Sequence, residues 1–126
     1  MYGSLPKMEK SFDFTVVGLT TGYKYEGTFT VRCVLTTAQR HAMEMEKTRL
    51  LADYKNPTQE LAVISSALAE CRHRISDGPG WWKDKLGADL LDEEIIFLLN
   101  SKCFEAEDEW KIDLKKKAEE AASKNV

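Results

Sequence analysis

The spacing of apolar residues changes near residue 36, and this change constrains the fold more than any other feature. Before it, apolar side chains alternate with polar or small ones in two runs, which are Phe12, Phe14 and Val16, and then Phe29, Val31, Cys33 and Leu35. A period of two places these side chains on one face of a β-strand. The residues after 36 follow helical spacing instead. The order of the two patterns predicts an α+β fold with its sheet at the N-terminus.

Turn-forming residues separate the two alternating runs. Thr20-Thr21-Gly22 is a turn signal, and Gly18 and Gly27 flank the short Tyr23-Lys24-Tyr25 stretch. The region 10–35 is therefore expected to form an antiparallel β-hairpin or a three-stranded meander. Because an isolated hairpin is only marginally stable, its Phe/Val face should pack on helices or on a second copy of the chain. A homo-oligomer is therefore a possible form of the protein.

Helical signals begin at Thr36. With Gln39 it fits a capping box, which predicts a first helix over about 38–54. Asn56 is expected to cap a second helix over about 57–75. The apolar seam of that second helix follows steps of three and four residues and consists of Leu61, Ile64, Leu68, Cys71 and Ile75.

A last helix should follow the Asp77-Gly78-Pro79-Gly80 break and start at Asp89 or Asp92. Its apolar stripe consists of Ile95, Leu99, Cys103, Ala106, Trp110 and Leu114. The stripe ends there, so residues 115–126 are expected to be a solvated or disordered tail. We predict one domain over 1–126, with a three-helix region at 36–114 whose second helix packs on the last. The expected core is Phe12, Phe14, Val16, Phe29, Val31, Leu61, Ile64, Leu68, Ile75, Ile95, Leu99 and Cys103.

Charge and composition argue against several classes of function. The formal net charge is −3, and residues 76–126 carry eight Lys/Arg against thirteen Asp/Glu. The chain lacks the dense basic face that phosphate neutralisation requires, so nucleic-acid binding is not expected. It also lacks a long apolar run and a signal-peptide pattern, so no membrane contact is expected. An odd set of widely spaced cysteines fits a reducing compartment.

The titratable and sulfur-bearing residues form no catalytic or metal-binding motif. His41 and His73 have no nucleophile in a local motif, which favours surface or capping roles. The cysteines lack the close Cys-x-x-Cys pairing of zinc sites, and Cys71 and Cys103 fall on apolar helix seams. We therefore expect no enzymatic activity, no cofactor and no metal.

Adjacent tryptophans after the Gly-Pro-Gly break are the most unusual local feature. Burying either Trp81 or Trp82 would leave the other at the rim, where tryptophan is enriched among binding hot spots. A cap on the helical core is the alternative interpretation. The side chains expected to mediate contacts with proteins are Trp81, Trp82, Tyr23, Tyr25 and Trp110.

Three segments together carry a family resemblance. They are Arg74-Ile75 leading to Pro79-Gly80-Trp81-Trp82, the Asp-Leu-Leu-Asp-Glu-Glu run from Asp89 to Glu94, and the helix end Glu105-x-Glu107-x-Glu109-Trp110. Over about residues 25–112 the chain resembles small morphogenesis proteins of tailed bacteriophages, most of all their tail assembly chaperones.

The resemblance implies a virion assembly protein without an active site. Its partners would be phage structural proteins, namely tape measure and tail tube proteins, and it would act in the host cytoplasm during assembly. The alternative is an accessory structural protein resident in the virion, at the capsid surface or the neck, with the major capsid protein as partner. In that case the hairpin would add an edge strand to a neighbouring subunit.

Overall fold

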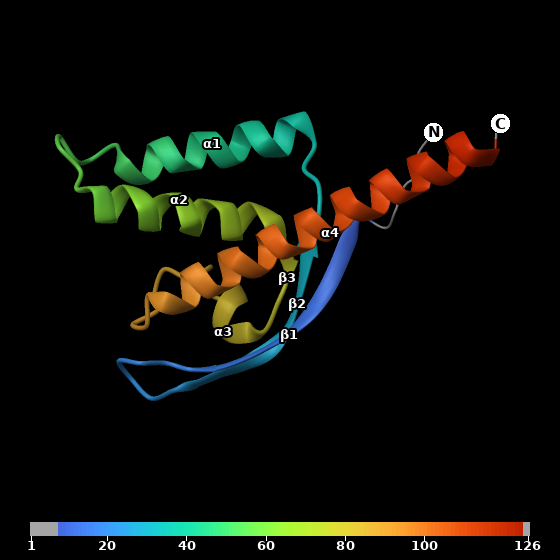
Figure 1. Cartoon of the computed structure of the whole chain (residues 1–126). Helices are drawn as coiled ribbons and strands as arrows, with labels where there is room; N and C mark the ends of the chain where they lie inside the picture. Colours follow the sequence, from blue (N-terminus) through green and yellow to red (C-terminus); the bar gives the residue numbers. More distant parts are fainter. Residues whose placement is uncertain (1–7, 125–126) are drawn as a thin grey trace.

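A computed structural model describes residues 8–124 and confirms the α+β class. A curved three-stranded antiparallel sheet lies on one side of three long helices (Figure 1). The elements in chain order are β1 (Glu9–Val17), β2 (Lys24–Arg32), α1 (Thr37–Leu51), α2 (Gln59–Arg74), β3 (Ile75–Asp77), α3 (Gly80–Lys83) and α4 (Glu94–Lys124).

The N-terminal sheet is built on the predicted hairpin. β1 and β2 pair in antiparallel register from Glu9 with Arg32 to Val17 with Lys24. The turn between them contains Gly22, whose φ of 72° lies in the left-handed region that favours glycine. Phe12 and Phe14 both contact the ring of Phe29 across the strands, at centroid distances of 5.4 and 5.8 Å. These pairs form the face that packs on the helices.

The helices α1 and α2 form an antiparallel pair (Figure 1). Thr36 and Gln39 form the predicted capping box at the start of α1. The prediction that Asn56 caps α2 was wrong. Thr58 is the cap, because its hydroxyl accepts the amide of Leu61 at 3.1 Å, and the helix begins at Gln59.

The core lies between the sheet, α2 and α4, and the predicted packing of α2 on α4 is confirmed. Seven of the expected core residues are buried: Phe14, Phe29, Val31, Ile75, Ile95, Leu99 and Cys103. The others are half-buried, which corrects the expected list: Phe12, Val16, Leu61, Ile64 and Leu68. Leu61 and Ile64 lie in the first two turns of α2.

Two short elements were not predicted. Ile75 was expected on the α2 seam but instead begins β3, which pairs with β2 through Val31. The break after it leads into the single turn of α3. This turn places Trp82 in the core, with 1% of its side chain exposed, and leaves Trp81 half-buried. A three-residue strand and a single helical turn are too short to give a periodic sequence signal.

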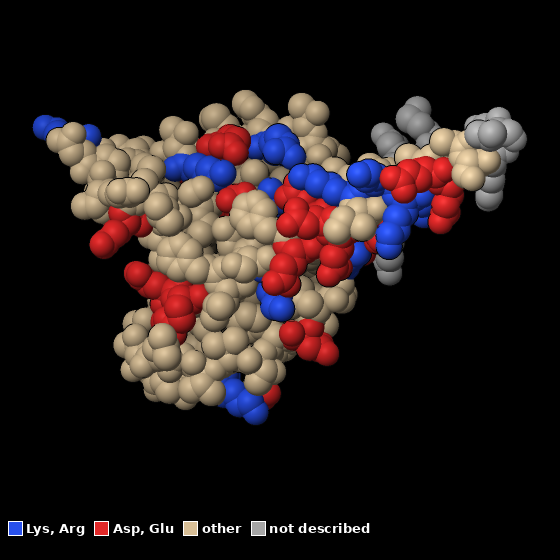
Figure 2. All heavy atoms as spheres, viewed as in Figure 1, with Lys and Arg blue, Asp and Glu red and all other residues tan. Residues whose placement is uncertain are grey.

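The last helix extends beyond the body of the protein (Figure 1). It is continuous to Lys124, although the apolar stripe ends at Leu114 and residues 115–123 are all exposed. On the face in Figure 2, acidic and basic residues are interspersed along the outer part of α4, while the hairpin surface is mostly uncharged. The solvated part of the predicted tail is thus a helix, and residues 125–126 lie outside the described region.

Candidate functional site

An aromatic pocket lies between the hairpin turn and the loop that precedes α4. Its volume is about 310 Å³. The hairpin supplies one wall, α3 with the turn after it supplies a second, and the loop supplies the third. The lining residues are Thr21, Tyr23, Tyr25, Trp81, Asp84, Asp89, Leu90 and Leu91. We refer to this set as the aromatic pocket.

The aromatic rings of the pocket contact one another edge to face. The rings of Tyr23 and Tyr25 lie 4.8 Å apart between centroids, and those of Tyr25 and Trp81 lie 5.1 Å apart, each pair at an interplanar angle of 66°. Such arrangements are favourable because the positive edge of one ring meets the negative face of the next. Trp81 is also held by its indole N–H, which donates to the carbonyl of Glu26 at 2.9 Å. The pocket wall is therefore preorganised.

A buried carboxylate supports the pocket from behind. Asp92 has no exposed surface, yet it lies in the loop just before α4. Its Oδ1 accepts the amide of Thr20 at 2.7 Å and that of Thr21 at 3.1 Å. Its Oδ2 accepts the hydroxyls of Thr21 at 2.6 Å and of Tyr25 at 2.7 Å. Thr21 and Tyr25 both line the pocket, so Asp92 fixes the wall of the pocket that the hairpin supplies.

These hydrogen bonds decide the ionisation of Asp92. Burial by itself raises the pKa of a carboxyl group, but here the hydrogen bonds from Thr21, Tyr25 and the backbone amides outweigh it and lower the pKa of Asp92 to about 2. Desolvation and the bond to Asp92 raise the pKa of Tyr25. At neutral pH the pair is therefore a neutral phenol that donates to a carboxylate.

Two further carboxylates belong to the pocket itself. Asp84 and Asp89 are both exposed, and within residues 8–124 neither forms an ion pair or a side-chain hydrogen bond with another residue. Within the described chain, the lining of the pocket includes no lysine or arginine, and Lys83 is paired with Asp77 at 3.1 Å. The opening of the pocket is thus acidic.

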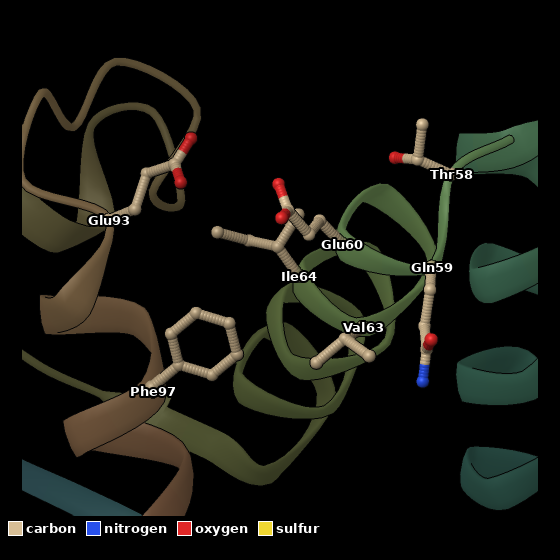
Figure 3. Close-up of a pocket in the computed structure, with 7 residues that line it drawn as sticks. All are labelled: Thr58, Gln59, Glu60, Val63, Ile64, Glu93 and Phe97. Carbon is tan, nitrogen blue, oxygen red and sulfur yellow. The ribbon is translucent and has the colours of Figure 1, made fainter.

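A second hollow, the α2/α4 groove, lies between the amino-terminal parts of these two helices (Figure 3). Its volume is about 710 Å³. Val63 and Phe97 point into it from opposite helices and are 49% and 39% exposed. A smaller hollow with both of these residues in its lining continues along α2 to Glu70 and Asn100. The lining of the main hollow is Thr58, Gln59, Glu60, Val63, Ile64, Glu93 and Phe97.

The cysteines and histidines do not gather at either hollow. Cys71 and Cys103 do meet, but inside the core, where both are fully buried. The neighbouring Cys103 thiol and burial raise the pKa of Cys71 well above its usual range, so the reactive thiolate is suppressed. Among residues 8–124, no group of three His, Cys, Asp or Glu side chains is arranged to hold a metal ion.

His73 takes part in an ion-pair network, whereas the sequence favoured a surface or capping role for it. Its Nε2 lies 2.7 Å from Glu46 Oε1, and Arg72 Nη1 donates to the other oxygen of Glu46 at 2.9 Å. Burial opposes these contacts, but they lower the pKa of Glu46. The network links α1 to the end of α2. His41 is exposed and takes no part in it.

The structure brings together three of the five predicted contact residues: Tyr23, Tyr25 and Trp81 all line the aromatic pocket. The prediction for Trp82 is corrected, because its side chain is in the core and cannot reach a partner. Tyr25 presents little surface, with 5% exposed. Trp110 lies on α4, about 24 Å along the helix axis from its start, where it packs against the core.

The sequence does not reveal the carboxylates of the pocket. In the sequence, Asp89 and Asp92 are candidate caps of the last helix and part of the run that carries the family resemblance, and no pattern distinguishes Asp84. No local signal distinguishes Asp92, since it is followed by Glu93 and Glu94 in one acidic run between Leu91 and Ile95. Its burial depends on donors in the hairpin turn, 71 and 72 positions away in the sequence, and is therefore a tertiary feature.

Comparison with known proteins identifies no relative: no protein family, curated protein or solved structure matches the chain. Among residues 8–124, none of the helices combines the length and apolar character required to cross a bilayer.

Proposed function

We propose that this chain is a non-enzymatic assembly protein of tailed bacteriophages that binds apolar segments of structural proteins in the manner of a tail assembly chaperone. The phage assignment rests on the resemblance of residues 25–112. The binding mode rests on one structural observation, which is the open α2/α4 groove with the exposed apolar side chains of Val63 and Phe97.

The groove has the composition of a client-binding surface. Exposed large apolar side chains that lie close together are unfavourable in water, and they favour contact with another apolar surface. Glu60 and Glu93 border the groove, as Figure 3 shows, and they would remain solvated when an apolar segment fills its centre. A partner bound in this way is shielded from aggregation and is released when its own assembly contacts replace the groove.

The second candidate is a structural protein of the virion, and the free edge of β1 favours it. In the sheet order β1-β2-β3, β1 pairs only with β2, so its other edge has no strand beside it among residues 8–124. A nine-residue edge can accept a strand from a neighbouring subunit through main-chain hydrogen bonds. Mass spectrometry of purified virions separates the candidates, because a chaperone should be absent and a structural protein should be present in many copies.

Groove binding is tested by co-expressing the chain with the tail tube and tape measure proteins of the phage that encodes it. The variant Phe97→Asp should lower the yield of soluble client and of co-purified complex by about tenfold, because a carboxylate in the groove must be desolvated when the client binds. The matched control is Ile112→Asp, which changes an apolar residue of the same helix that is 55% exposed but lies outside the groove. Equal yields from both variants and the unmodified chain would exclude the groove as the binding surface.

A further inference from the structure

We propose that the aromatic pocket is a binding site for a basic side chain, lysine or arginine, of a partner protein. The site is separate from the α2/α4 groove in its lining residues, and the inference holds whether or not the groove binds a client. Three aromatic residues line the same hollow as two carboxylates that have no ion-pair partner among residues 8–124, and a cation is the group that both favour.

The rings supply the first part of this preference. The faces of aromatic rings are negative, and cations bind them most strongly on tryptophan and next on tyrosine. Tyr25 donates its hydroxyl proton to Asp92 at 2.7 Å, which increases the electron density of the phenol ring. Trp81 cannot turn away, because its N–H is bound to Glu26 O and its ring packs on Tyr25. These contacts exist before any ligand arrives.

The carboxylates supply the second part. Asp84 and Asp89 line the pocket from different segments, and neither is neutralised by an ion pair within the described chain. Asp92 adds a third negative charge behind Tyr25 and Thr21. From Trp81 to Glu94 the chain carries five carboxylates and two lysines, and one of those lysines is already paired with Asp77. The local field therefore attracts a cation and repels an anion.

The remaining walls explain why the cation should sit on a flexible apolar stem. Leu90 and Leu91 line the pocket, and Leu91 is 73% exposed. The methylene groups of a lysine or arginine can pack on leucine while the charged end reaches the rings and the carboxylates. A volume of about 310 Å³ accommodates one such side chain. A metal ion would gain nothing from the leucine and aromatic walls.

The test is an NMR titration of the full ¹⁵N-labelled chain with short blocked peptides that contain one central arginine or lysine. Peptides with citrulline or norleucine at that position are the uncharged controls. The basic peptides should produce saturable shifts of the Trp81 indole N–H and of the amides of Tyr23 and Asp89, with a Kd in the millimolar range. The Trp81 indole signal is assigned by its loss in Trp81→Phe. Raising the salt concentration should weaken the binding.

Variants connect the shifts to the pocket. The double change Asp84→Asn and Asp89→Asn should weaken peptide binding roughly fivefold, because each exposed ion pair contributes a small amount. Asp53→Asn with Asp108→Asn is the matched control, since both aspartates are exposed and lie outside the pocket, and it should bind as the unmodified chain does. Phe97→Asp should also bind normally, which separates this site from the groove. Equal shifts with the citrulline peptide, or unchanged affinity in the Asp84/Asp89 variant, would overturn the proposal.

Discussion

The hydroxyl of Tyr25 donates a 2.7 Å hydrogen bond to Asp92, and this contact joins β2 to the loop that starts α4. Both side chains are buried, and they lie 67 positions apart in the sequence. The same carboxylate also binds Thr20 and Thr21 of the hairpin turn. Asp92 therefore holds the tip of the hairpin against the helical layer, together with Glu94, which accepts the amide of Leu19 at 2.7 Å. Asp92 also shapes one wall of the aromatic pocket.

Neutralising Asp92 should destabilise the protein in a pH-dependent way. Folding lowers the pKa of Asp92 from 3.8 to about 2, so its stabilising contribution is complete above about pH 4 and is lost as the pH falls towards 2. Asp92→Asn should lower the Tm by about 5–10 °C at pH 7, because the amide cannot accept all of these donors. Thermal unfolding followed by circular dichroism at pH 7, 4, 3 and 2 measures the difference.

The difference between Asp92→Asn and the unmodified chain should shrink from pH 4 to pH 2. Asp108→Asn provides the control, because Asp108 is exposed on α4, and its Tm should follow that of the unmodified chain at every pH. A constant difference across this range would mean that Asp92 stabilises the fold through shape alone and not through its charge.

Gly18 tests the same contact from the side of the hairpin. A β-carbon at Gly18 would overlap the carboxylate of Asp92, and this carboxylate cannot move aside because both of its oxygens are fixed by hydrogen bonds. Gly18→Ala should therefore lower the free energy of unfolding by about 1–3 kcal/mol, the usual cost of an inserted methyl group in a packed site. Gly80→Ala, where nothing lies within 4 Å of the added carbon, should change it by less than about 0.5 kcal/mol in urea unfolding. Equal costs at the two positions would contradict the geometry.

The regular elements could be predicted from the sequence because each has a local signal. The alternation around Phe14 and Phe29 predicts β1 and β2, and the capping box at Thr36 predicts the start of α1. β3 has no such signal, since Ile75 also continues the spacing of α2. Its conformation is decided by pairing with Val31, a contact between residues 44 positions apart.

The candidate site was predictable only as a set of residue types. Aromatic side chains at Tyr23 and Trp81 stood out in the sequence, and the structure brings them to one pocket. Which tryptophan is buried depends on the single turn of α3 and on Gly87, whose added β-carbon would lie 2.8 Å from the Trp82 ring. Close packing between segments that are distant in the sequence cannot be predicted from the spacing of apolar residues or from composition.

Trp82→Ala should unfold or strongly destabilise the chain, in contrast to the surface role that the sequence suggested. The side chain is 1% exposed and contacts Phe29 at a centroid distance of 6.4 Å. Removing a buried tryptophan costs about 3–5 kcal/mol, through lost burial and the cavity that remains. Urea unfolding monitored by circular dichroism gives the value. Tyr23→Ala is the comparison, because Tyr23 is 54% exposed and its loss should cost less than about 1 kcal/mol.

Arg74 should be essential to the contact between α2 and α4. It is 4% exposed, donates to Glu107 at 2.9 Å and lies over the ring of Phe104 at 5.1 Å. Arg74 also pairs with Glu70 at 3.4 Å. Arg74→Met should cost about 2–3 kcal/mol, since a charged hydrogen bond is lost and Glu107 and Glu70 keep only their lysine partners. Burial raises the pKa of Glu107, but Lys111 and Arg74 together lower it below its ordinary value. The variant should therefore raise this pKa, as NMR titration of the Glu107 side chain can measure, and an unchanged value would contradict the ion pair.

Truncation after Leu114 should remove helix without removing stability. Residues 115–123 are exposed along their whole length and continue α4 beyond its apolar stripe. An isolated helical end gains little free energy when no other element packs on it. The truncated chain should lose ellipticity at 222 nm in proportion to the deleted residues, while its Tm changes by less than about 2 °C. A larger decrease, particularly one that depends on protein concentration, would show that this end of α4 packs on a second copy of the chain.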